Sequence, residues 1–111
     1  MDNYSFEERL LYSQRLNTRY PDYVPVIIKK SDNDKTPTEF YHKYLMPKKT
    51  KFSEVIFIIR KKLDLNSKEA IFIFAKNTLI PMNNTVGEVY DFYKSDDNFL
   101  YIIYRTENTF G

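Results

Sequence analysis

Hydrophobic and polar positions along the chain change their period several times, which predicts helices and strands. Apolar residues at about every third or fourth position predict amphipathic helices, whereas short runs rich in branched and aromatic residues predict strands. The tetrads Ser5–Glu8 and Thr85–Glu88 have the form of capping boxes and predict where two helices begin. The pattern predicts a helix over 5–19, strands over 24–29 and 43–47, a helix over 52–63, strands over 71–75 and 78–80, a helix over 85–93 and a strand over 99–104.

Two details of the pattern indicate how the strands pair. Lys76-Asn77 separates two strand-like runs and predicts a two-residue hairpin turn that lacks the usual glycine. The run 99–104 is almost continuously apolar, which is typical of a strand buried on both faces at the centre of a sheet, beside an early strand. This order predicts an α+β fold, a ubiquitin-like β-grasp with an added N-terminal helix. We expect Phe57, Phe72 and Phe74 in its core.

Length and composition fit one globular domain. The chain has 111 residues, of which 42% are hydrophobic and 29% are charged, enough to bury one core but not two. We expect an N-terminal helical extension over 1–23, a ubiquitin-like β-grasp core over 24–105 and a flexible C-terminal tail over 106–111. The first residues lack a basic segment followed by an apolar stretch, so a cytoplasmic protein is expected.

The residue types present argue against several function classes. A net charge of +2 gives no reason to expect a nucleic-acid partner. The chain has no cysteine, so it can form no disulfide, no thiolate metal site and no thioester of its own. His42 is the only histidine, so a metal or nucleophile–base site would lack its other members. We therefore expect no enzymatic activity, no catalytic residues, no metal and no cofactor.

The last residue, Gly111, follows a short polar tail after the last predicted strand. Glycine has no Cβ, so an extended tail ending in it can thread a narrow enzyme channel and leave its carboxylate open to adenylation and acyl transfer. This pattern favours a chain that is joined to another molecule through Gly111.

Several separate motifs carry a resemblance to a known family. These segments, in their order along the chain, are Tyr20–Ile27, Lys43–Pro47, Ile58–Leu63, Ala70–Phe74, Phe99–Tyr101 and Glu107–Gly111. Together they resemble the autophagy-8 family of ubiquitin-like modifiers, and the similarity extends from about Phe6 to Gly111.

The resemblance implies that the Gly111 carboxylate is activated by an adenylating enzyme, passed through enzyme thioesters and joined to the amine of phosphatidylethanolamine. The implied partners are activating and conjugating enzymes, a processing and deconjugating cysteine protease, cargo receptors and phosphatidylethanolamine membranes. The implied locations are the cytoplasm and, after lipidation, the autophagosome membrane.

The resemblance also implies a site for partner segments of the pattern aromatic-x-x-aliphatic, bound as an added strand on the edge of the second strand. Matching positions around the aromatic pocket are Tyr12, Leu16, Pro25, Ile27, Lys43, Leu45 and Phe99. Matching positions around the aliphatic pocket are Tyr44, Met46, Pro47, Val55, Ile58 and Ile59. The cations expected near the site are Lys43, Arg60 and Lys62.

Four positions depart from the family pattern. Tyr12 stands where the family usually has an acidic residue, and Tyr23, Tyr41 and His42 stand where it usually has basic residues. The charged rim of the aromatic pocket is therefore expected to be thinner. Two alternatives remain open: a modifier of the autophagy-12 kind, attached to a protein lysine, and a peptide-binding module that is never conjugated.

Overall fold

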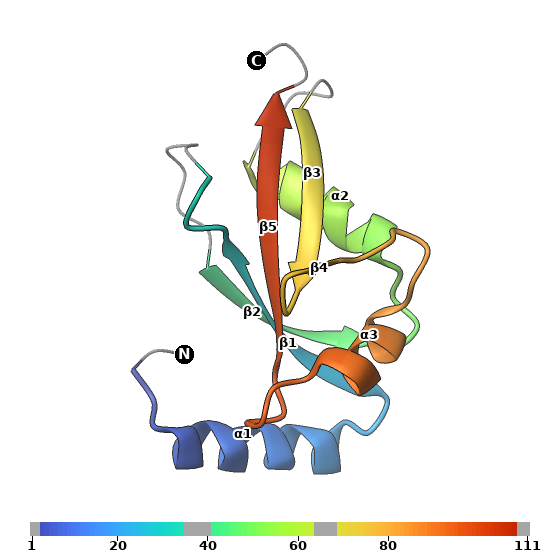
Figure 1. The fold of residues 1–111 in the computed structure, drawn as a ribbon. Helices are drawn as coiled ribbons and strands as arrows, with labels where there is room; N and C mark the ends of the chain where they lie inside the picture. The colour runs from blue at the N-terminus through green and yellow to red at the C-terminus, as the bar shows by residue number, and fades with distance from the viewer. Residues whose placement is uncertain (1–2, 35–40, 64–68, 109–111) are drawn as a thin grey trace.

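A computed structural model describes residues 3–34, 41–63 and 69–108 of the chain. Helices and strands follow one another in the predicted order (Figure 1). They are α1 (Phe6–Arg19), β1 (Tyr23–Lys30), β2 (Tyr41–Pro47), α2 (Phe52–Leu63), β3 (Glu69–Ala75), β4 (Thr78–Leu79), α3 (Val86–Tyr93) and β5 (Leu100–Asn108). The predicted α+β β-grasp with an added N-terminal helix is confirmed.

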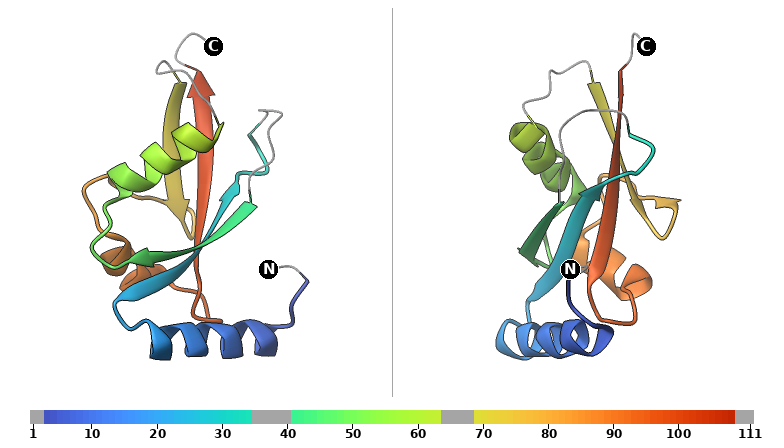
Figure 2. Two further views of the ribbon diagram at one scale, coloured as in Figure 1. Left: turned by 180° about the vertical axis from the view of Figure 1, so that it is seen from behind. Right: turned by 90° about the vertical axis from the view of Figure 1, so that its left-hand side faces the viewer.

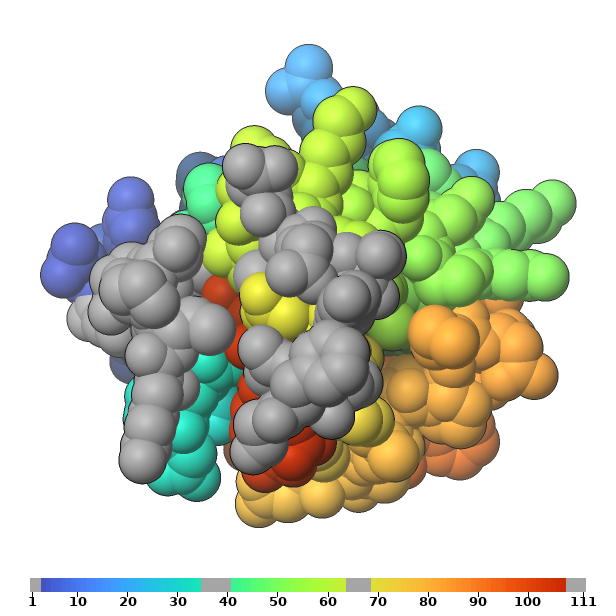
Figure 3. Space-filling model, turned by 90° about the horizontal axis from the view of Figure 1, so that it is seen from above, coloured from blue at the N-terminus to red at the C-terminus, as the bar shows by residue number. Residues whose placement is uncertain are grey.

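One sheet has the strand order β2-β1-β5-β3-β4. The last strand, β5, lies at its centre beside β1, as its continuous apolar run predicted. It is parallel to β1 and antiparallel to β3. Leu100, Ile102 and Tyr104 of β5 are fully buried. Seen from above, the red end of β5 has the yellow of β3 beside it (Figure 3). Within the described ranges, β2 and β4 are therefore the edges of the sheet.

The main core lies between α2 and the sheet (Figure 2). Phe52, Val55 and Ile59 of α2 recur at helical spacing and are fully buried. Phe57 falls between them on the outer face of α2 and is 65% exposed. Its predicted place in the core is wrong, because the phase of the helix outweighs the hydrophobicity of a single ring.

Phe72 and Phe74 of β3 are half-buried instead of lying in the core. They alternate along β3 with Ile71, Ile73 and Ala75, which are buried. Successive side chains of a strand point to opposite faces, so the core receives the isoleucines and the alanine and not the two rings.

Both predicted helix starts are present. The Ser5 hydroxyl accepts from the Glu8 N–H at 3.1 Å, and the Ser5 N–H donates to the Glu8 carboxylate at 3.0 Å, which completes a capping box. At α3 the Thr85 hydroxyl accepts from the Glu88 N–H at 3.2 Å and donates to the Glu88 carboxylate at 3.0 Å. The second tetrad therefore caps α3 through its hydroxyl.

The predicted hairpin turn at Lys76-Asn77 joins β3 to β4. Both residues have positive φ, 48° and 64°. A two-residue turn of type I′ requires this conformation at both central positions, and asparagine tolerates it better than most residues. The hairpin therefore forms without glycine.

The last strand runs through Asn108, past the expected start of the tail at 106. Thr106 is paired with Ile71 of β3. On its other side, the Asp34 carboxylate accepts from the Thr106 N–H at 2.6 Å and from its hydroxyl at 2.9 Å. The Asp34 side chain thus binds the backbone of β5 beyond the point where its pairing with β1 ends. Gly111 lies outside the residues that the structure describes.

Candidate peptide-binding site

The edge of β2 forms the centre of the candidate site. β2 is antiparallel to β1, with Leu45 opposite Pro25 and Lys43 opposite Ile27. Residues directly opposite one another share a face of the sheet, so these four side chains lie on one face. In the described part of the chain no strand pairs with the other edge of β2. An added strand can therefore pair along that edge over Lys43–Pro47.

Three of the predicted aromatic-pocket residues come together from α1, from β2 and from the turn before β5. The Tyr12 ring of α1 lies 6.0 Å from the Phe99 ring, centroid to centroid. The Lys43 ammonium of β2 donates to the Tyr12 hydroxyl at 2.9 Å and lies 4.2 Å from the centre of the Tyr12 ring. Phe99 is fully buried, whereas Tyr12 is half-buried and Lys43 is exposed. This face of the sheet therefore carries an aromatic wall with a cation at its rim.

Leu16 and Tyr12 line a hollow of about 300 Å³ on α1. Three further residues line it that the sequence analysis did not assign to the site: Arg15, Arg19 and Tyr20. Positions 12, 15, 16, 19 and 20 fall on one face of a helix, so helical phase was the signal that could have found them. Arg15 and Arg19 add two cations to this rim, while Tyr23, Tyr41 and His42 are exposed as uncharged or weakly basic groups.

The predicted aliphatic-pocket residues divide between the surface and the core. Met46, Val55 and Ile59 are buried and belong to the main core. Tyr44 and Ile58 are half-buried, and Pro47 is exposed, so these three are accessible to a partner. Burial raises the pKa of the Tyr44 hydroxyl.

Two of the predicted cations differ in their surroundings. The Arg60 guanidinium donates to the backbone carbonyl of Glu69 at 2.8 Å and is turned toward β3. Lys62 is exposed and lines a hollow of about 450 Å³ on α2 together with Phe57, Ile58 and Lys61. Lys61 and Lys62 therefore place exposed positive charge beside Ile58.

Comparisons with known proteins place the chain in a family. A family model described as autophagy protein Atg8, ubiquitin like, matches residues 8–111. The chain belongs to the Atg8 family. It is therefore a ubiquitin-like autophagy protein, as the motifs of the sequence indicated.

Relatives in the Atg8 family match the chain over nearly its whole length. Autophagy-related protein 8 of Schizosaccharomyces pombe is 41% identical over 110 residues, which cover 99% of this chain and 91% of the relative. Autophagy-related protein 8e of Arabidopsis thaliana is 40% identical over 111 residues, which cover 100% and 90%. The crystal structure of Trypanosoma brucei ATG8 has a TM-score of 0.86 at 30% identity and covers 97% of this chain and 93% of that one.

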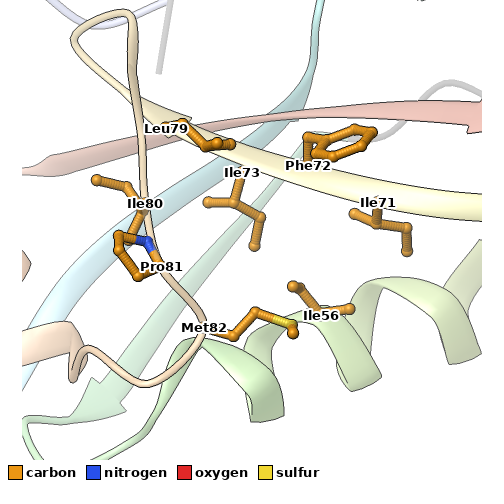
Figure 4. Close-up of a pocket in the computed structure, with 8 residues that line it drawn as sticks. All are labelled: Ile56, Ile71, Phe72, Ile73, Leu79, Ile80, Pro81 and Met82. Carbon is orange, nitrogen blue, oxygen red and sulfur yellow. The ribbon is translucent and has the colours of Figure 1, made fainter.

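A further apolar pocket of this Atg8-family chain lies between α2 and the β3–β4 hairpin and is lined by none of the residues assigned to the peptide site. It has a volume of about 360 Å³. In Figure 4, Ile71 and Ile73 point toward α2, where Ile56 and Met82 approach each other. No motif in the sequence indicated this pocket.

Neither a metal-ligand cluster nor a membrane-spanning helix occurs in the part of the chain that the structure describes. Within residues 3–34, 41–63 and 69–108, no three His, Asp or Glu side chains gather closely enough to hold a metal ion. Among the helices that the structure describes, none combines the length and the apolar character that crossing a bilayer requires.

Proposed function

We propose that this Atg8-family chain recruits partners with an aromatic-x-x-aliphatic segment and is conjugated through Gly111 to phosphatidylethanolamine. The observation that carries the recruitment is the open edge of β2 between two different surfaces. One surface contains Tyr12, Lys43 and Phe99, and the other contains Tyr44 and Ile58. An added strand gains affinity from main-chain hydrogen bonds, and side-chain pockets on either side supply specificity.

The parts of the chain have separate tasks in this proposal. The helical extension over 1–23 supplies one wall of the aromatic pocket, the core over 24–105 supplies the edge strand, and the tail over 106–111 supplies the acyl donor. Because the chain has no cysteine, the thioesters that precede conjugation form on cysteines of the activating and conjugating enzymes. A cysteine protease of the autophagy system processes and releases Gly111. The free chain is cytoplasmic, and the conjugate lies on autophagosome membranes.

Conjugation is tested by incubating the chain with autophagy activating and conjugating enzymes, ATP and phosphatidylethanolamine vesicles, followed by intact-mass measurement. The expected product carries one phospholipid, joined by an amide with loss of water. Gly111→Ala is expected to remain unmodified and folded, because the added methyl obstructs a narrow enzyme channel. A lipid-modified Ala variant would contradict the role of Gly111 as acyl donor.

The same mass measurement on chain isolated from its native cell separates the alternatives. Attachment to a protein lysine would favour a modifier of the autophagy-12 kind. An unmodified chain that still binds the peptide would favour an unconjugated binding module.

A further inference from the structure

The Asp97 carboxylate, in the turn before β5, is buried and binds three donors. Its Oδ2 atom accepts from Arg9 Nε of α1 at 2.9 Å and from the Tyr101 hydroxyl at 2.6 Å. Its Oδ1 atom accepts from the Phe99 N–H at 3.0 Å. The Asp97 side chain is only 4% exposed. A buried carboxylate needs such partners, so this one holds all three groups near a single point.

The backbone of the same turn is bound to α1 as well. The Ser13 hydroxyl donates to the Asp97 carbonyl at 2.6 Å. Asn17 reaches the turn through Tyr90: its amide donates to the Tyr90 hydroxyl at 3.3 Å, and that hydroxyl donates to the Asn98 carbonyl at 2.8 Å. Figures 1 and 2 show this turn, between α3 and β5, lying against α1.

The three α1 residues of this contact form one polar stripe. Arg9, Ser13 and Asn17 are spaced by four positions and lie on one face of the helix. Ser13 is the one buried residue of α1, while Phe6 at the start of the helix is 45% exposed. α1 therefore meets the turn through hydrogen bonds and one ion pair. Such contacts fix distance and direction more narrowly than apolar packing does.

The peptide site depends on this geometry because two of its residues flank the contact. Phe99 follows the turn directly, and its backbone N–H is one of the Asp97 donors. Tyr12 precedes Ser13 on α1, and its ring faces Phe99 at 6.0 Å. The carboxylate thus holds both the end of the turn, at Phe99, and the helix that carries Tyr12.

We propose that Asp97 is a positioning residue for the aromatic pocket: it sets the separation between Tyr12 on α1 and Phe99 before β5. The inference rests on the proposed peptide binding but concerns a residue outside the peptide site. It distinguishes the two pockets, because in the described residues no hydrogen bond or ion pair joins Asp97 to β2 or α2, the elements that carry Tyr44 and Ile58. Loss of its charge therefore weakens recognition of the aromatic residue and spares recognition of the aliphatic one.

The test compares Asp97→Asn with Asp96→Asn, a neighbouring exposed carboxylate, on two peptides. One peptide carries the aromatic-x-x-aliphatic motif, and the other carries alanine in place of the aromatic residue. Asp97→Asn is expected to weaken binding of the first peptide about ten- to one hundred-fold and to leave binding of the second within about twofold. Asp96→Asn is expected to change neither. An equal loss for both peptides, or no loss, would overturn the proposal.

A second measurement tests the positioning without a peptide. Nuclear Overhauser contacts between the Tyr12 and Phe99 rings are expected in the wild type and to be weakened in Asp97→Asn; unchanged contacts would overturn the proposal. If the wild type binds neither peptide, the proposed recruitment function fails, while this measurement still decides the role of Asp97. Should Asp97→Asn fail to fold, Arg9→Gln breaks the ion pair and keeps the Tyr101 and Phe99 bonds, and the same selective loss is expected, at a smaller size.

Discussion

The Lys43 ammonium lies 2.9 Å from the Tyr12 hydroxyl oxygen and 4.2 Å from the centre of the Tyr12 ring. Tyrosine thus binds the cation without neutralising it, whereas an acidic residue at this position would form an ion pair. Among the described residues, no carboxylate lies within ion-pair distance of Lys43. The charge at the rim of the aromatic pocket therefore remains available to a partner.

Tyr12→Glu is expected to weaken binding of a peptide with acidic residues before its aromatic anchor by about 0.5–1.5 kcal/mol. The new carboxylate would pair with Lys43 and repel the acidic flank. The salt dependence of binding should become shallower, because rim charges act over a Debye length of about 8 Å at physiological salt. Tyr12→Phe keeps the ring and the free charge and serves as the control. Titrations at several ionic strengths measure this, and equal slopes for the two variants would refute it.

Leu45→Ala and Ile58→Ala are each expected to weaken binding of the aromatic-x-x-aliphatic peptide by about 1–3 kcal/mol, the usual cost of truncating an anchor contact. Both side chains are half-buried, so the melting temperature should fall only modestly. Leu79→Ala, at an exposed position on the opposite edge of the sheet, should bind like the wild type. Calorimetry decides the matter, and unchanged affinity in both folded variants would eliminate the two-pocket site.

Ile59→Ala is expected to reduce the free energy of unfolding by about 2–5 kcal/mol, because the side chain is fully buried in the core. Phe57→Ala, two positions earlier on the outer face of α2, should change it by no more than about 0.5 kcal/mol. Urea unfolding of both variants provides the measurement. Similar losses in the two would show that the burial of these residues has been assigned wrongly. Because Ile59→Ala destabilises the fold, a change in its peptide affinity can be interpreted only after the variant has been shown to be folded.

The free energy of unfolding is expected to fall at alkaline pH because of Tyr101. Burial raises its pKa, and the hydrogen bond to Asp97 raises it further. The folded chain then keeps a proton that the unfolded chain loses above about pH 10. The stabilisation is complete below that pH and is lost as the pH rises toward the folded pKa. Tyr101→Phe should flatten the decline of unfolding free energy above about pH 10, and parallel profiles would argue against this cause.

Local signals in the sequence determined most of the secondary structure and the order of its elements. The capping box at Ser5, the turn at Lys76-Asn77 and the apolar run before Arg105 each involve residues close together in the chain. Their hydrogen bonds and periodicity act within a few positions, so a single sequence displays them directly. The motifs that indicated the Atg8 family are contiguous segments of the same kind.

The tertiary structure alone decided which face of α1 is buried. The sequence predicted a helix over 5–19 but not which of its faces is buried. Ser13 and Arg9 make the contacts, and their partner Asp97 lies 88 positions from Arg9 along the chain. A polar stripe looks like a solvated face until its distant partner is known. Asp34 and Thr106, 72 positions apart, illustrate the same limit at the end of β5. Sequence periodicity predicts which apolar side chains are buried. The partners of a buried carboxylate lie far from it in the sequence, so only the folded chain shows which donors bind it.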